Sequence, residues 1–142
     1  MLMKCQEDIN DMTANNSKWD SLFRADFSDQ ALATVMKFLL PDFIEKDGFV
    51  LLKEQHDVLN LQDIALKYKG NKREVEKAIN CVDFTDVFDC RLVSAELQNL
   101  VKQVAELWRW HLKTLFPNKI FDIEVVDFSD DGAWGIIVAE AK

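Results

Sequence analysis

The residues with the most suggestive chemistry are a run of acidic and hydroxyl side chains near the C-terminus. The spacing with which an EF-hand calcium loop begins is shared by Asp127, Ser129, Asp131 and Gly132. Such a loop needs a carboxylate at its twelfth position, where this chain has Val138, and a helix on each side, where this chain alternates as strands do. We therefore expect a hairpin turn, in which Asp and Gly are favoured for their backbone conformations.

A second acidic group has its members three residues apart: Asp83, Asp86 and Asp89. On a helix these carboxylates would lie near one another and could bind a hard cation or shift one another's pKa. Because nothing nearby supplies a nucleophile or a phosphate-binding loop, we favour a solvated face. The apolar side chains of the same segment would then point inward: Phe84, Val87 and Phe88.

Histidine and cysteine have no spacing that predicts a metal site. His56 and His111 are not paired at ligand spacing, and no CxxC motif joins Cys5, Cys81 or Cys90. His111 lies in an apolar stretch, where a buried imidazole could be a general base, but a hydrogen-bonded core histidine is more common. With 4 glycines and no phosphate-binding or nucleophile motif, the sequence predicts no metal, no cofactor and no catalytic residue. It favours a protein that is not an enzyme.

Charge is the remaining functional signal. The 142 residues contain 17 Lys and Arg against 25 Asp and Glu, a net charge of −8, which disfavours general nucleic-acid binding. Residues 120–141 contain acids and no base, whereas residues 67–77 are mainly basic. The acidic hairpin is either a docking face for a basic partner or the solvent side of an amphipathic hairpin.

The elements that position these residues change period along the chain. Residues 1–16 are a polar lead-in. Ser17 and Ser28 are the candidate N-caps of two successive helices, and Pro41 should end the second of them. Residues 43–52 predict a β-hairpin with Gly48 in its turn. Two helices follow, one from Leu61 to Gly70 and one from Asn71 through Val82, and the segment 83–92 stays open between helix and loop.

The clearest element is a long helix over residues 94–116. One apolar seam recurs at helical spacing: Leu97, Val101, Val104, Trp108, His111 and Leu115. A second apolar flank is formed by Leu100, Leu107 and Trp110, so the helix should be covered on two sides, either inside the fold or in a dimer. Strands are then predicted from Phe121 and from Ala133, with a bulge or twist near Val126.

The order of elements predicts an α+β fold. We expect about five helices and two antiparallel β-hairpins, joined in one small sheet packed against helix 94–116. Hydrophobic residues are 49% of the chain, which suits one core, and no Pro-, Gly- or Ser-rich linker divides residues 1–142, so a single domain is predicted.

The leading functional hypothesis is a non-catalytic protein-binding module, such as an inhibitor of the immunity-protein type, that meets a basic partner. The residues expected to contact that partner are Asp122, Glu124, Asp127, Asp130, Asp131 and Trp134. This hypothesis follows from size, charge and the missing motifs.

Two alternatives remain open. One is a small-molecule-binding protein or enzyme with a pocket between the sheet and the long helix, lined by Trp108, Trp110 and His111. The other is a homo-oligomer that pairs through helix 94–116. The absence of a signal sequence or membrane span and the odd cysteine count predict a cytoplasmic protein without a membrane partner.

Overall fold

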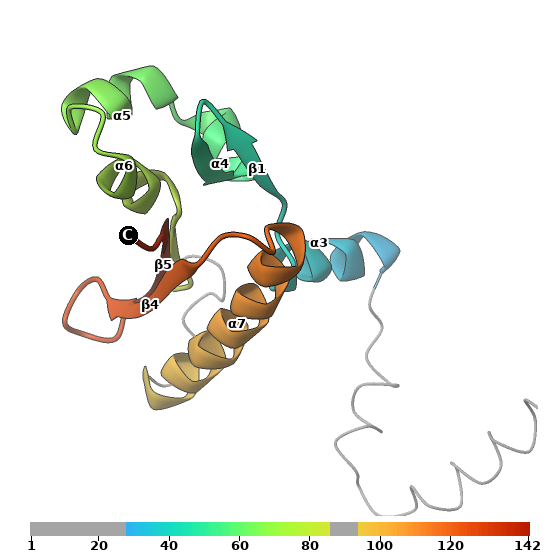
Figure 1. The fold of residues 1–142 in the computed structure, drawn as a ribbon. Helices are drawn as coiled ribbons and strands as arrows, with labels where there is room; N and C mark the ends of the chain where they lie inside the picture. The colour runs from blue at the N-terminus through green and yellow to red at the C-terminus, as the bar shows by residue number, and fades with distance from the viewer. Residues whose placement is uncertain (1–27, 86–93) are drawn as a thin grey trace, which may run out of the picture. The chain divides into compact units, whose positions relative to one another are not determined.

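The computed structural model describes residues 28–85 and 94–142 (Figure 1). The chain divides into two compact units, Met1–Val35 and Met36–Lys142, and each is considered by itself. The single domain expected from the sequence stays a prediction. The lead-in 1–16, the helix expected after Ser17, and residues Asp86 and Asp89 lie outside the described residues.

The first described helix is α3, Asp29–Leu39. It begins where the sequence predicts, because the Ser28 hydroxyl accepts a hydrogen bond from the Ala31 amide at 3.1 Å. It ends just before Pro41, which disfavours helical geometry in the residue before it.

The first hairpin is confirmed as β1, Phe43–Lys46, and β2, Phe49–Leu52. Its two turn residues, Asp47 and Gly48, both have positive φ angles, 52° and 82°. This is the geometry that a two-residue hairpin turn of type I′ requires. The short helix α4, Lys53–Val58, follows directly and was not predicted.

Helices α5, Leu61–Lys67, and α6, Lys72–Ile79, are each capped by an asparagine side chain, from Asn60 and Asn71. The prediction that α6 would continue through Val82 is wrong. The helix ends at Ile79, and residues Cys81–Asp83 form strand β3. The reason is tertiary: β3 pairs antiparallel with β5, with Val82 opposite Ile136.

The second hairpin consists of β4, Phe121–Asp127, and β5, Trp134–Glu140. The register runs unbroken from Phe121 opposite Glu140 to Asp127 opposite Trp134. Of the bulge or twist predicted near Val126, the bulge is therefore absent from this ladder, and the twist stays a prediction. With β3 the hairpin forms a sheet of order β3-β5-β4, separate from β1-β2 among the described residues. The two hairpins therefore do not share one sheet, and this detail of the prediction is corrected.

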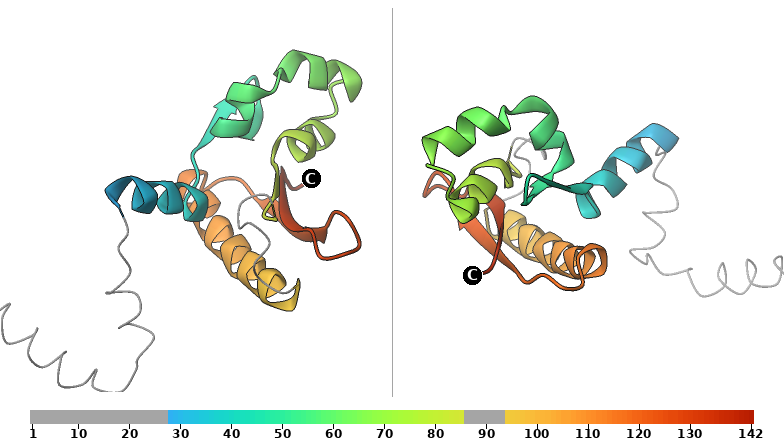
Figure 2. Two further views of the ribbon diagram at one scale, coloured as in Figure 1. Left: turned by 180° about the vertical axis from the view of Figure 1, so that it is seen from behind. Right: turned by 45° about the horizontal axis from the view of Figure 1, so that its top comes forward.

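Helix α7, Ser94–Leu115, packs against β4 and β5 (Figures 1 and 2), and the α+β class is confirmed. Its buried residues are Leu97, Val101, Val104, Ala105, Trp108 and Leu112. Two members of the predicted seam differ: His111 is half-buried at the edge of the buried face, and Leu115 is exposed in the last turn. Leu112 takes the inner position because it follows Trp108 by one full turn. No helix in the described part of the chain is long and apolar enough to cross a membrane.

Candidate functional site

The acidic strand β4 faces the basic helix α6 of the same chain. The Arg73 Nη1 lies 2.6 Å from Oδ2 of Asp122, and the Lys77 Nζ lies 3.4 Å from Oε1 of Glu124. The two oppositely charged segments recognised in the sequence therefore contact each other. Two of the five carboxylates expected to meet a partner already have cationic neighbours.

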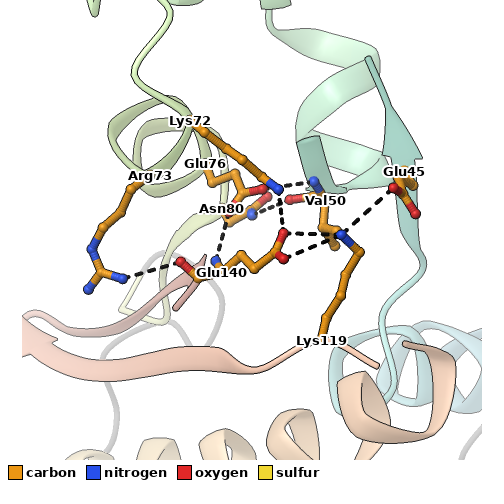
Figure 3. Close-up of polar contacts among 8 residues, drawn as sticks. All are labelled: Glu45, Val50, Lys72, Arg73, Glu76, Asn80, Lys119 and Glu140. Atoms are coloured by element: carbon orange, nitrogen blue, oxygen red, sulfur yellow. Dashed lines mark hydrogen bonds and ion pairs between the residues drawn. The ribbon is translucent and has the colours of Figure 1, made fainter. Parts of the chain in front are cut away.

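A third acidic residue of this hairpin, Glu140, is held by two lysines (Figure 3). Its carboxylate pairs with Nζ of Lys72 and, at 3.2 Å, with Nζ of Lys119, which also lies 3.8 Å from Glu45. Partial burial opposes ionisation of Glu140, but the two ammonium groups outweigh it and lower the pKa of this carboxyl. The hydrogen bond to Glu140 in turn raises the pKa of Lys72.

Two fully buried polar residues, Glu76 of α6 and its C-cap Asn80, bind two separate strands (Figure 3). The Glu76 carboxylate accepts hydrogen bonds from the amides of Val50, at 3.0 Å, and Glu140, at 2.7 Å. The Asn80 side chain accepts from Leu52 and donates to the carbonyls of Val50 and Val138. These bonds join β2 to β5, so this polar cluster is a structural link between the sheets.

In the loop between β4 and β5, polar side chains accept hydrogen bonds from backbone amides of the loop itself. The Asp127 carboxylate accepts from the amides of Ser129 and Gly132, and the Ser129 hydroxyl accepts from the amides of Asp131 and Ala133. Among the described residues, no group of three or more potential ligands could hold a metal ion. The loop is the hairpin turn that the sequence favoured over a calcium loop. Asp130 and Asp131 remain exposed at its tip.

The predicted anchor Trp134 is half-buried, and its indole donates a hydrogen bond to the Ser94 hydroxyl at 3.1 Å.

The three residues of the predicted pocket have three different environments. Trp108 is buried and donates to the Phe38 carbonyl at 2.9 Å, whereas Trp110 lies on the outer face of α7. The Nε2 atom of His111 lies 2.9 Å from the Pro41 carbonyl, so Nε2 carries the proton and His111 acts as a bonded core-edge residue.

A cavity of about 600 Å³ opens beside Trp108, and we call it the Trp108 cavity. It lies between the end of α3, the start of α4, strand β3 and the inner face of α7. Its apolar wall is formed by Phe38, Pro41, Leu52, Val82, Trp108 and Phe128. Phe84 and Phe43 support this wall from behind, since both rings pack on Trp108 with centroids 6.1 and 6.0 Å away.

The Phe128 side of the cavity depends on a glycine. Gly135 of β5 lies so close to the Phe128 ring and to the Val82 carbonyl that a Cβ atom at this position would overlap both. The absence of a side chain lets the ring lie against β5. Gly135 therefore positions one wall of the Trp108 cavity.

The polar wall of the cavity is mainly acidic. It is formed by Lys37, Asp42, Glu54, Gln55, Cys81 and Asp83, which include three carboxylates and one ammonium group. Asp83 is partly engaged, since its Oδ1 accepts from the Thr85 amide at 2.9 Å. In the part of the chain that the structure describes, neither Asp42 nor Glu54 has an ion-pair partner.

Cys81 is the thiol of this wall. Burial, and then the nearby charge of Asp83, raises the pKa of Cys81 above its ordinary value. A thiol with a raised pKa is a poor nucleophile, because the thiolate is the reactive form. The Gln55 side chain donates to the Cys81 carbonyl at 3.4 Å and fixes the start of β3 against α4.

Sequence reasoning identified Trp108 as a pocket residue and missed the rest of the cavity. Its other walls come from the linker Pro41–Asp42, the unpredicted α4 and the unpredicted β3. One signal was available: the helix expected from Asn71 contains Asn80, a residue that favours helix ends over helix interiors. A stop at this residue would have left Cys81–Asp83 free to form a strand.

Comparison with known proteins gives no relative for this chain. No protein family matches it, and neither a curated protein nor a solved structure does so.

Proposed function

We propose that the chain is a small-molecule-binding protein whose Trp108 cavity takes an organic cation with an apolar body. One observation carries the proposal: an apolar wall and an acidic wall border one open pocket of about 600 Å³. Ligand sites commonly have volumes of about 300–1,000 Å³ and combine an apolar lining with a few polar groups.

The charge of the expected ligand follows from the polar wall. Asp42, Glu54 and Asp83 outnumber Lys37, so the field in the cavity attracts positive charge. The aromatic residues of the opposite wall suit the same ligand, because ring faces attract cations and stack on apolar groups. An amine or quaternary ammonium group attached to a ring or a short hydrocarbon satisfies both walls.

The side chains of the cavity support ligand binding without a catalytic reaction. Cys81 supplies the thiol in the wall of the cavity, and burial raises the pKa of this thiol. His111 is hydrogen-bonded to the Pro41 carbonyl. Neither arrangement supplies the activated nucleophile and adjacent base that covalent catalysis needs.

The inhibitor hypothesis stays a second candidate, on a smaller surface than the sequence suggested. Asp122 and Glu124 already contact α6, which leaves the exposed turn residues Asp130 and Asp131 beside the exposed Phe128. Capture of a basic partner from the source cell, lost in Asp130→Asn/Asp131→Asn and at high salt, would support this candidate. Capture that ignores both changes would contradict it.

The cavity proposal is tested with three probes that share one ring and differ in charge. Ligand-detected NMR titrations compare 2-phenylethylamine, 2-phenylethanol and phenylacetate, which are cationic, neutral and anionic at pH 7. We expect the amine to bind most tightly and phenylacetate least. Equal affinity for all three, tighter binding of phenylacetate, or no binding at all would overturn the proposal.

A pair of variants locates the effect. Asp42→Asn/Glu54→Gln should lower the affinity for the amine by about three- to tenfold and leave that for the alcohol unchanged, as expected for partly exposed charges. The matched control, Asp130→Asn/Asp131→Asn, removes the same charge from two turn residues that do not line the cavity. It should change neither affinity.

A further inference from the structure

The outer face of α7 carries apolar side chains that the other described residues leave exposed. Trp110 is 60% exposed and Leu107 is 40% exposed, although both belong to the apolar flank that was expected to be covered. Trp110 lies nearly opposite the buried stripe that contains Leu97 and Trp108, since residues of a helix advance by about 100° each. A large exposed aromatic residue is a common anchor of protein interfaces.

Two opposite charges lie along one edge of this flank, one on either side of Trp110 along the helix axis. Glu106 lies one turn before Trp110 and Lys113 lies one turn after it, on the same side of the helix. The Glu106 side chain is 73% exposed, and among the described residues its ion-pair partner is Nε of Arg109, at 3.5 Å. Lys113 has no ion-pair partner among the described residues.

We propose that a second copy of this chain covers the flank, with the two α7 helices antiparallel and a two-fold axis near Trp110. In that arrangement the same side of each helix meets the same side of the other. Glu106 of each copy then lies opposite Lys113 of the other, and the two ion pairs border the Trp110 and Leu107 side chains.

The charges select this arrangement over the alternative pairing. In a parallel dimer in register, Glu106 would face Glu106 and Lys113 would face Lys113, and like charges in contact are repulsive. The antiparallel pair converts both contacts into attractions. The dimer is independent of the Trp108 cavity, because Leu107, Trp110, Glu106 and Lys113 do not line it.

The experiment is sedimentation equilibrium of the full chain over a range of concentrations. We expect a monomer–dimer equilibrium, and Trp110→Ala should raise the dissociation constant by about tenfold or more. Circular dichroism confirms that the variant is folded. A chain that stays monomeric at all concentrations, or a dimer that Trp110→Ala does not weaken, would overturn the proposal.

Charge reversal tests the register. Glu106→Lys and Lys113→Glu should each weaken the dimer about tenfold, because each places two like-charge contacts at the two-fold axis. An equimolar mixture of the two variants should recover a heterodimer, and the double variant should recover the homodimer. Lys102→Glu, a reversal outside the paired turns, serves as the control. If the mixture and the double variant stay as weak as the single variants, the antiparallel register is wrong.

Discussion

Glu76 of α6 and Asn80, the C-cap of that helix, hydrogen-bond to the backbones of both β2 and β5. Glu76 accepts from Val50 and Glu140, while Asn80 binds Leu52, Val50 and Val138. Side-chain hydrogen bonds thus connect the two sheets where none of the described strands pairs with both. Buried polar groups of this kind stabilise a fold only when every donor and acceptor has its partner.

Isosteric substitutions should expose this dependence. Glu76→Gln turns one of two acceptors into a donor that faces a backbone amide, and Asn80→Asp removes the donors to two carbonyls. Each change should lower the free energy of unfolding by about 1–3 kcal/mol, the usual cost of an unsatisfied buried group. Urea unfolding measures it.

Glu74→Gln, on the exposed face of the same helix, is the control. It should change the free energy of unfolding by no more than about 0.5 kcal/mol, as surface substitutions usually do. A Glu76→Gln variant as stable as this control would contradict the assigned role of the buried carboxylate.

The local parts of this fold were predictable, and the long-range parts were not. Ser28, Pro41, Gly48 and Asn71 mark helix ends and a turn through backbone preferences that act within a few residues, and the structure agrees at each. Strand β3 depends on pairing with β5, more than 50 residues later, and no local pattern encodes it.

The same distinction applies to the candidate site. Trp108 belongs to a strong helical pattern, so its inward position could be inferred. The internal pairing of Asp122 with Arg73 could not, because charge counts along the sequence do not say which segments meet. The acidic and basic stretches were both recognised, and their contact in space changed the meaning of each.

The ion pairs of Glu140 predict a loss of stability in acid. Its pKa is lowered in the folded state, so its contribution is fully present above the ordinary value of 4.5 and is lost as the pH falls through the lower folded value. Unfolding measured below pH 4.5 should therefore show a steeper decline for the parent chain than for Glu140→Gln. Identical slopes would show that Lys72 and Lys119 do not stabilise the carboxylate.

Gly135 predicts a steric effect on the cavity wall. Gly135→Ala would press a methyl group against the Phe128 ring and the Val82 carbonyl. Overpacking of this kind should cost about 1–3 kcal/mol in urea unfolding. Combining it with Phe128→Ala should recover only the part due to the ring, because the Val82 carbonyl stays in place. An unchanged stability of Gly135→Ala would contradict the close approach.

Cys81 predicts a pH profile of thiol modification. In a Cys5→Ser/Cys90→Ser background it is the one thiol left in the chain. Because burial raises its pKa above the ordinary value, the alkylation rate should still be rising with pH at pH 9. A plateau below pH 8.5 would indicate an activated thiolate and would favour the enzyme hypothesis.

The same single-cysteine chain gives the most direct test of the central claim, that the Trp108 cavity binds an organic cation. Cys81 lines that cavity, so its alkylation by iodoacetamide reports occupancy of the site itself. We predict that saturating 2-phenylethylamine slows the reaction at least about fivefold, that phenylacetate does not, and that Asp42→Asn/Glu54→Gln requires more amine for the same protection. Alkylation at one rate with and without the amine would contradict the account.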